Sequence, residues 1–410
     1  MGKRKKTVDD RFDDLLDEMQ AKYPGKVLRG DEYTAPWMLR RLPTGILNLD
    51  IATNGGLPAG GMTMLVGKEN IGKNWLAYQI IRKQQDIYGD EAKFAIIGTE
   101  MSFDKNQAKK AGVRIAYTQP EIDALDRARK MAGKPPLTQE ETDWLRDQVG
   151  KFVIVPPETA ESSYDKCEKM VAANVFNVIL LDSFGSILTK EEDEKELDEV
   201  ERMAGAAGLN TRFMRKLNAA FAPDKYGNPN LTCLLGTNQV RSNLKAQGKY
   251  DKQTIESGGW ALKHGRFVTV ELAHAAWIYR SKSDKTKIGR TVRWELTKQK
   301  AGGHGGQQGK YDLLFPSGVG SLKDFKDEDG SPSKRFVLET GATLKHDRAM
   351  MALDLALKHD LLQKSGNWIQ MEGDNIGNGR NAAARYLVKK DILDDLEEEI
   401  LQINGAFYMI

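Results

Sequence analysis

Short apolar runs alternate with amphipathic stretches through the middle of the chain. The apolar runs are rich in Val, Ile, Leu and Phe, which is typical of buried strands, and they lie at 62–66, 94–98, 152–155, 178–182 and 231–237. Stretches with helical spacing separate them. This alternation predicts an α/β fold whose largely parallel sheet is covered by helices.

The N-terminal flank has a helical pattern of its own. Apolar residues recur there at helical spacing until Pro24-Gly25 ends the pattern: Val8, Phe12, Leu15, Leu16 and Met19. We therefore predict an N-terminal helical arm and linker over residues 1–40. The apolar stripe needs a partner, either this chain's own core or a neighbouring subunit, and periodicity does not choose between them.

Breaks in the pattern divide the rest of the chain. Residues 41–335 are predicted to form the core domain, and the polar, helical residues 119–149 to form a helical hairpin inserted in it. The Gly-rich segment 302–309 is flexible in composition. A helical pattern resumes after residue 340, so we predict a small C-terminal α+β domain over 340–410.

Composition narrows the class of protein. The chain has 410 residues, of which 40% are apolar and 29% charged, and no apolar run approaches the roughly 20 residues that cross a bilayer. The basic start leads into acidic residues without the apolar segment of a secretory signal. Cys167 and Cys233 lack His or Cys neighbours at metal-ligand spacing, which does not fit a zinc site. We therefore expect a cytoplasmic protein with no membrane partner.

The net charge of +3 does not by itself indicate nucleic acid as a partner, and the distribution of charge is more informative. Residues 190–201 are strongly acidic, whereas 241–252 carry four basic residues against one Asp: Arg241, Lys245, Lys249 and Lys252. The pattern fits a basic loop beside an acidic one, and it also fits two solvated surface segments.

The strongest chemical signal directly follows the first core strand. Residues 67–73 have the spacing G-x-x-x-x-G-K between a predicted strand and a predicted helix. The backbone amides of such a loop bind phosphates, the helix N-terminus adds positive potential, and the lysine reaches the outer phosphates. We expect an ATP site formed by Gly67, Lys68, Glu69, Asn70, Ile71, Gly72, Lys73, Asn74 and Trp75.

Position 74 departs from this motif. A Ser or Thr hydroxyl normally binds Mg²⁺ there, whereas this chain has Asn74. An amide oxygen is also a ligand for a hard cation, but the longer side chain changes the geometry around an ion that tolerates little deviation. We expect nucleotide binding to survive this change and leave the rate of hydrolysis open.

Polar residues end three further strands. Asp182 follows one apolar run and is suited to hold the Mg²⁺ shell, while Glu100 follows another and is suited to polarise the attacking water. Gln239 ends a third, where its amide can sense the terminal phosphate and pass the signal to the basic segment. Each residue alone is compatible with an ordinary strand end. Together with the phosphate loop, and in this order, they indicate an ATPase.

Several motifs resemble those of the bacterial and phage RecA family of DNA strand-exchange recombinases. In the family's order they are Leu42-Pro-Thr-Gly45, the phosphate loop, Asn238-Gln239-Val-Arg241, Gly258-Gly-Trp-Ala-Leu-Lys263 and Lys298-Gln-Lys300, and the C-terminal stretches 361–368 and 376–384 are also similar. The resemblance covers residues 10–400 apart from the insertion. It implies a RecA-like P-loop ATPase core with an N-terminal arm and a small C-terminal domain.

The resemblance also implies roles for individual residues. Glu100 would be the catalytic carboxylate, Lys73 the phosphate-loop lysine and Gln239 the switch between nucleotide and DNA. Lys298 and Lys300 would reach the ATP of a neighbouring subunit. Further residues would bind Mg²⁺ (Asn74, Asp182) or lie near the adenine amino group (Asp104), and DNA would contact Arg215, Arg241, Lys245, Lys249 and Lys252. Gln107 stands where the family often stacks a tyrosine on the base.

The implied function is an ATP- and Mg²⁺-dependent recombinase. It would form a helical filament on single-stranded DNA and exchange strands with homologous double-stranded DNA in a bacterium or a phage-infected cell. The insertion and the altered phosphate loop favour a bacteriophage source by analogy. Two alternatives stay open: a DNA-coating filament with impaired hydrolysis, indicated by Asn74, and a RecA-fold helicase or motor, which residues 361–384 disfavour.

Overall fold

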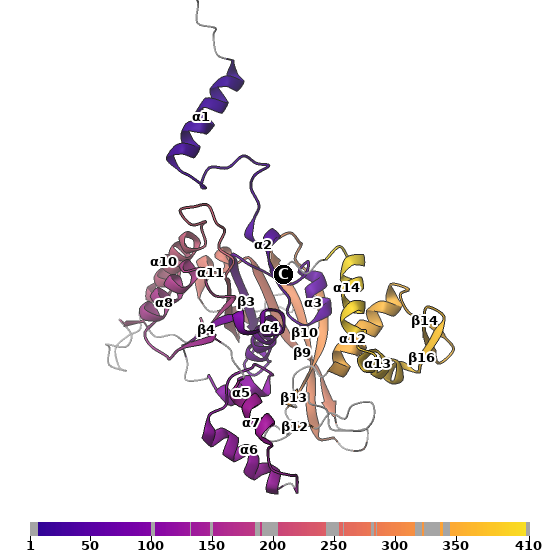
Figure 1. Ribbon diagram of the computed structural model, residues 1–410. Coiled ribbons are helices and arrows are strands. Elements are labelled where there is room, and N and C mark those ends of the chain that lie inside the picture. Colours follow the sequence, from indigo (N-terminus) through magenta and orange to yellow (C-terminus); the bar gives the residue numbers. More distant parts are fainter. Residues whose placement is uncertain are drawn as a thin grey trace, which may run out of the picture.

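The structure, a computed structural model, describes residues 7–99, 103–131, 133–147, 151–184, 189–190, 204–242, 254–256, 258–279, 283, 285–315, 322–323, 337–338 and 345–406. An α/β core domain carries a protruding N-terminal helix at one end and a C-terminal domain at one side (Figure 1).

The core is built on one large sheet with the strand order β11-β10-β9-β3-β7-β6-β4-β5. The strands from β9 to β5 are parallel, and β10 and β11 extend the sheet in antiparallel pairing. The prediction of an α/β fold with a mostly parallel sheet is confirmed. The bounds are β3 (Gly61–Gly67), β4 (Lys93–Gly98), β5 (Lys151–Val155), β6 (Val178–Asp182), β7 (Cys233–Ser242), β9 (Val268–Tyr279), β10 (Lys287–Gln299) and β11 (Gln308–Leu314), and β8 (Thr254–Glu256) pairs with β7.

Helices cover both faces of the sheet. Alternate residues of a strand point to opposite faces, so Leu65 of β3 packs in a cluster with α4 (Lys73–Tyr88), while Met64 packs in a second cluster with α8 (Ala160–Ala172) and α10 (Ala204–Ala220). β3 is buried along its whole length, which explains its continuous apolar sequence. Two short helical elements complete the core, η1 (Gly89–Glu91) and α11 (Gly259–Gly265).

The Gly-rich segment 302–309 makes defined contacts with other parts of the chain. Asn54 Nδ2 donates to the Gly302 carbonyl, and β11 begins within the segment at Gln308. Gly309 lies directly against the Trp294 indole, where a Cβ atom would have no room. Contacts from distant parts of the chain therefore fix a segment whose local sequence indicates flexibility.

Three helices lie between β4 and β5: α5 (Lys105–Lys110), α6 (Gln119–Met131) and α7 (Gln139–Arg146). Glu121 of α6 forms ion pairs of 3.1 Å with both Lys105 and Lys109 of α5. The buried pair Arg129–Glu141 joins α6 to α7 at 3.3 Å. The residues predicted as an inserted hairpin, 119–149, thus contain α6 and α7, and ion pairs attach them to α5.

The N-terminal helix α1 (Val8–Lys22) protrudes from the core (Figure 1). A capping box formed by Thr7 and Asp10 starts it, and none of its residues is buried. The chain then reaches the core through α2 (Pro36–Leu39), β1 (Arg41–Leu42), α3 (Leu47–Ala52) and β2 (Leu57–Pro58). The apolar stripe of α1 therefore has no partner in the described part of its own chain.

The C-terminal domain packs three helices around a small antiparallel sheet. It consists of α12 (Lys345–Lys358), β14 (Gln363–Ser365), β15 (Trp368–Met371), β16 (Asp374–Asn378), α13 (Arg380–Lys389) and α14 (Leu393–Ile403). Leu47 of α3 belongs to its apolar cluster and joins it to the core. β12 (Leu322–Lys323) and β13 (Val337–Leu338) pair with each other. Within the described ranges, no helix is both long and apolar enough to span a membrane.

Candidate nucleotide site

The phosphate loop joins the end of β3 to the start of α4. Asn70 and Gly72 adopt left-handed backbone conformations, with φ of 57° and 109°. Gly72 meets this requirement without strain, and Asn is one of the residues that tolerate it best. Lys73 is the first residue of α4, and its Nζ donates to the carbonyls of Gly67 (3.0 Å) and Lys68 (2.9 Å). These carbonyls hold the ammonium group against the loop.

Asp182 lies beside this loop because β6, β7 and β3 are neighbours in the sheet and end at the same edge. Asn74 Nδ2 donates to Asp182 Oδ2 at 2.6 Å, and Thr237 Oγ1 of β7 donates to Oδ1. The backbone N–H of Thr99, after β4, donates to the Asp182 carbonyl at 2.7 Å. Four chain segments that are distant in sequence thus meet at Asp182, two of them through hydrogen bonds to its carboxylate.

The pair Asn74 and Asp182 fits a hard cation such as Mg²⁺. The Asn74 amide gives its N–H to Asp182, which leaves its carbonyl oxygen as a ligand, and the carboxylate supplies the negative charge. These are the oxygen donors that Mg²⁺ prefers. The same hydrogen bond ties the amide to the carboxylate, a restraint that differs from that of a Ser or Thr hydroxyl.

Gln239 stands next to the phosphate loop. In the parallel pairing of β3 and β7, Gln239 lies opposite Gly67, and its backbone N–H donates to Asn238 Oδ1 at 2.9 Å. Asn238 is buried, whereas Gln239 is partly exposed. The residue that is predicted to be the switch therefore lies beside the first residue of the predicted phosphate loop.

Two other predicted nucleotide contacts lie on either side of the loop. Asp104 caps α5, where its Oδ1 accepts from Asn106 N at 2.8 Å. The pKa of Tyr78 on α4 is raised by burial and then by the nearby carboxylates of Asp182 and Asp104, which places both acids around one tyrosine. The Trp75 indole stacks on Tyr311 with 5.4 Å between ring centroids. Its side chain thus joins α4 to β11.

Lys298 and Lys300 lie away from the end of β3 that leads into the phosphate loop. Lys298 pairs with Thr269 of β9, which pairs with Met64 in the middle of β3, three residues before Gly67. Lys298 and Lys300 Nζ donate to the His264 carbonyl at the end of α11 at 3.0 and 2.8 Å. Burial, then the charges of Lys300 and Arg266, lower the pKa of Lys298 to about 8.

The predicted DNA contacts are only partly within the described residues. Arg215 is exposed on α10 and Arg241 lies on β7. Four predicted site residues lie outside the described residues: Glu100, Lys245, Lys249 and Lys252.

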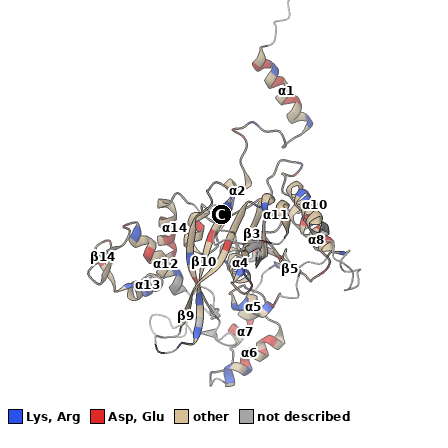
Figure 2. Cartoon of the chain, turned by 180° about the vertical axis from the view of Figure 1, so that it is seen from behind, with Lys and Arg blue, Asp and Glu red and all other residues tan. Residues whose placement is uncertain are grey.

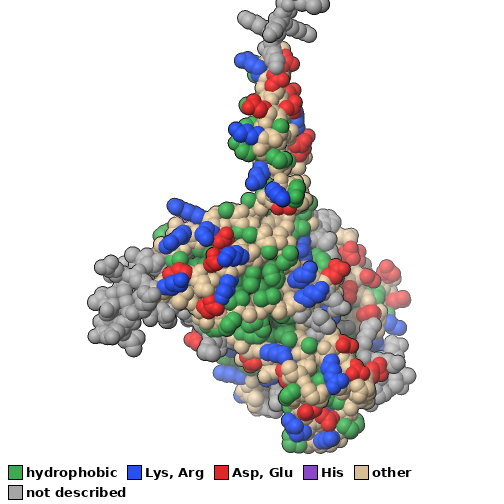
Figure 3. All heavy atoms as spheres, turned by 60° about the vertical axis from the view of Figure 1, so that its left-hand side comes forward, with side chains coloured by type: hydrophobic (Ala, Val, Ile, Leu, Met, Phe, Trp, Pro, Cys, Tyr) green, Lys and Arg blue, Asp and Glu red, His purple; other side chains and the backbone are tan. Residues whose placement is uncertain are grey.

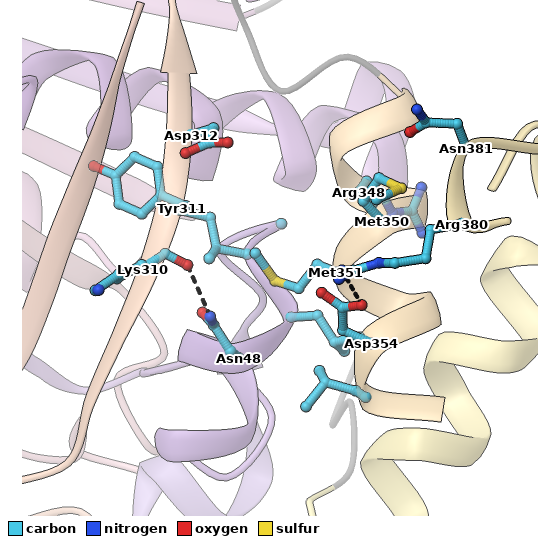
Figure 4. A pocket seen from close by; sticks show the side chains of 14 residues that line it. Asn48, Lys310, Tyr311, Asp312, Arg348, Met350, Met351, Asp354, Arg380 and Asn381 are labelled. Atoms are coloured by element: carbon cyan, nitrogen blue, oxygen red, sulfur yellow. Dashed lines mark hydrogen bonds and ion pairs between the residues drawn. The ribbon is translucent and has the colours of Figure 1, made fainter. Parts of the chain in front are cut away.

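A cavity of about 530 Å³ lies between the core and the C-terminal domain (Figure 4). Asn48 Nδ2 donates to the Lys310 carbonyl at 2.9 Å on its core side, and Arg380 forms an ion pair with Asp354 on its C-terminal side. The Arg380 guanidinium therefore has an ionic partner within its own domain.

Sequence reasoning missed Thr237 and Thr99. Both follow apolar runs and carry no motif, and their contacts with Asp182 and Ser183 depend on which strands are neighbours. A polar residue at the end of a buried strand is the sequence signal that could have found them. Only the carboxylates and amides at such ends were predicted as site residues.

Comparison with known protein families gives two matches. A model described as the RecA N-terminal domain matches residues 140–320, and one described as the RecA C-terminal domain matches 351–405. Together they cover more than half of the chain. The first match begins after the phosphate loop.

Individual relatives are similar over a greater length. Protein RecA of Leptospira biflexa is 23% identical over 383 residues, covering 93% of this chain and 79% of that protein. Protein RecA of Roseiflexus castenholzii is 24% identical over 396 residues (95% and 89%). Protein RecA of Chloroflexus aurantiacus is 24% identical over 383 residues (93% and 87%).

Proposed function

Because the chain belongs to the RecA family, we propose that it is an ATP-driven recombinase that forms filaments on single-stranded DNA and catalyses homologous pairing and strand exchange. The observation that carries this proposal is the meeting of Lys73, Asn74 and Asp182 at one sheet edge, with Gln239 paired to the same loop. This arrangement supports phosphate binding coupled to the segment that follows β7.

Phosphate binding and hydrolysis are assigned to the following groups. The loop amides and Lys73 bind the phosphates, and Glu100 orients and polarises the attacking water. Asn74 and Asp182 would hold Mg²⁺, which neutralises charge on the phosphates. Gln239 passes the state of the nucleotide to residues 241–252.

Assembly completes the site. The Nζ atoms of Lys298 and Lys300 point to the end of α11 and not to their own phosphate loop, so we assign them to the nucleotide of a neighbouring protomer, where they stabilise the charge that develops during phosphoryl transfer. Hydrolysis then depends on polymerisation.

The exposed stripe of α1 is a surface suited to this assembly. An apolar groove of about 360 Å³, lined in part by Trp37, Leu217 and Phe267, lies near the base of the N-terminal arm. Figure 3 shows hydrophobic side chains gathered on the face below α1. We assign the groove to α1 of a neighbouring copy, because burying both apolar surfaces stabilises the contact.

DNA is held by its backbone in this proposal. Arg215, Arg241 and the lysines of 241–252 contact phosphates, so affinity falls as salt concentration rises. Base pairing, and not the protein, reads homology, which allows any sequence to be exchanged.

One observation favours a second candidate. The hydrogen bond from Asn74 to Asp182 restrains both Mg²⁺ ligands and supports a filament that binds ATP and coats DNA but hydrolyses slowly. This candidate keeps nucleotide-gated DNA binding and loses turnover.

A strand-exchange assay tests the proposal. A labelled single strand is incubated with a homologous or a heterologous duplex, with ATP and Mg²⁺. We expect a joint product with the homologous duplex alone. Nucleotide-dependent DNA binding without any joint product would favour the coating protein.

A further inference from the structure

An aromatic and basic cluster lies where β9, β10 and β11 run beyond the phosphate loop. We call Trp277, Lys287, Arg290 and Phe315 the hairpin cluster. Lys287 Nζ lies 4.1 Å from the centroid of the Trp277 ring, and Arg290 Cζ lies 4.9 Å from it and 5.2 Å from the Phe315 centroid. The two rings meet edge to face at 6.3 Å. Figure 2 shows basic residues along this part of the β9 region.

The hairpin cluster is not part of the apolar core. The Trp277 side chain is partly exposed, and its neighbour Tyr279 is 39% exposed. Arg290 Nε is buried and has no hydrogen-bond partner among the described residues, and its guanidinium faces two rings. The Trp277 ring also lies 4.8 Å from the His274 ring, centroid to centroid, and a partly exposed ring beside cations is the composition of a binding surface for a flat, polar aromatic group.

The sheet register places this cluster beside the phosphate loop. Leu313 of β11 lies so close to Gly72 that a Cβ atom there would be 2.8 Å from its side chain. Leu313 pairs with Arg290, and Arg290 pairs with Trp277. Residues directly opposite each other share a face of the sheet, so all three lie on the face that carries the loop. Two strand spacings, about 10 Å, separate Leu313 from Trp277, which suits a nucleotide whose phosphates lie at the loop.

The other side of the loop supplies no aromatic ring on α5. Asp104 and Gln107 stand there, and Asp104 accepts a hydrogen bond from its own helix. In Figure 1, α5 with the insertion and the lower end of the β9–β10 hairpin project at the same end of the core. A nucleotide bound at the loop would thus have a polar wall on the α5 side and an aromatic wall on the hairpin side.

We propose that Trp277, backed by Arg290, is the platform on which the base of the bound nucleoside triphosphate stacks. This inference rests on the proposed function, because it takes the phosphates to occupy residues 67–74. Stacking accepts any flat base, and the cations strengthen it by polarising the indole. The phosphate loop holds the charge of the ligand, and the hairpin cluster adds the affinity that distinguishes a nucleotide from a bare polyphosphate.

The test measures the affinity of the full-length chain for ATP and for inorganic tripolyphosphate by calorimetry with Mg²⁺. Trp277→Ala is expected to weaken ATP binding about tenfold, since stacking on an aromatic side chain is worth roughly 1–3 kcal/mol per base. Tripolyphosphate affinity should not change. Trp277→Phe keeps a ring and should retain most ATP affinity. Trp368→Ala, an exposed tryptophan of the C-terminal domain, is the matched control and should leave both affinities unchanged.

Three results would overturn the inference. One is unchanged ATP affinity in Trp277→Ala, and another is a wild-type chain that binds ATP no more tightly than tripolyphosphate. A third is a loss in Trp277→Ala confined to a thymidine oligonucleotide, which would assign the hairpin cluster to nucleic acid. In each case the phosphate loop still binds its ligand and the proposed function stands. A wild-type chain that binds neither ATP nor tripolyphosphate would overturn the proposed function and this inference together.

Discussion

The phosphate-binding edge and helix α1 lie beyond opposite ends of β3 and are built in opposite ways. At the edge, Lys73 and Asp182 form hydrogen bonds with their surroundings, and the strands β3 and β6 beside them are buried. On α1, Phe12 is 60% exposed and no residue is buried. Folding of a single chain therefore brings together the phosphate-loop side of the nucleotide site, to which Lys298 and Lys300 of a neighbour would be added in the proposed assembly. The apolar stripe of α1, by contrast, has no partner among the described residues of its own chain. Substitutions in the two regions should therefore separate nucleotide binding from assembly.

The largest effect is expected for a substitution at the phosphate-binding edge. Lys73→Ala removes the cation at the loop and should weaken ATP binding about 100-fold, because a hydrogen bond to a charged group contributes roughly 1.5–3 kcal/mol. Calorimetry measures this loss, and thermal unfolding monitors the fold. Lys68→Ala, an exposed lysine of the same loop, is the control and should change affinity far less. ATP binding within threefold of the wild type in Lys73→Ala would remove the nucleotide site from the loop.

A substitution on α1 should act on assembly alone. Phe12→Glu should weaken self-association roughly 30-fold, since burying such a side chain contributes about 2 kcal/mol. Sedimentation of the chain with ATP and single-stranded DNA measures the association. The melting temperature should hardly change, because Phe12 is 60% exposed and lies outside the apolar core of the described residues. Asp14→Asn on the same helix is the control. A lowered melting temperature in Phe12→Glu would show that α1 belongs to its own core.

A substitution of Asn74 tests the proposed Mg²⁺ site at the phosphate-binding edge. Asn74→Thr restores a hydroxyl at the Mg²⁺ position and frees the Asp182 carboxylate from the amide, so turnover should rise about tenfold, or 1.4 kcal/mol in the barrier. Steady-state hydrolysis in the presence of DNA measures this. ATP affinity should stay nearly constant because the loop amides are unchanged. Unchanged turnover would show that Asn74 serves the reaction as well as a hydroxyl does.

The smallest effect is expected from the protonation of Lys298, which would reach the nucleotide of a neighbouring protomer. The lowered pKa of Lys298, about 8, means that its ammonium is charged below that pH and becomes neutral above it. Lys298 must therefore be protonated before it contacts the phosphates of a neighbour's nucleotide, which would then raise its pKa. Association in the presence of ATP should decline about threefold between pH 7 and pH 9, because proton uptake becomes unfavourable above pH 8. Lys298→Arg stays charged over this range and should remove the decline. The same decline in both proteins would exclude Lys298 as its cause.

The fold could be predicted from the sequence where burial requires a local pattern of apolar residues. Parallel strands buried on both faces have continuous apolar sequences, and this located β3 and β6. Lys73 and Asp182 were found for a related reason, since they follow such strands in a recognisable order. The composition of the Gly-rich segment 302–309 does not indicate its contacts with Asn54 and Trp294, because these depend on tertiary packing.

What the sequence did not reveal depends on register. Thr237 reaches Asp182 only because β6 and β7 are neighbours, and Trp277 meets Arg290 only through the pairing of β9 with β10. No local pattern encodes either contact. The placement of Lys298 at the end of α11 likewise depends on tertiary packing.

The most direct test of coupling between the phosphate-binding edge and assembly on DNA is the rate of ATP hydrolysis with Mg²⁺, measured with and without single-stranded DNA. The account predicts slow turnover by the free chain and strong stimulation by DNA, which brings Lys298 and Lys300 of one protomer to the nucleotide of the next. Turnover that is the same with and without DNA, or absent in both conditions, would contradict it.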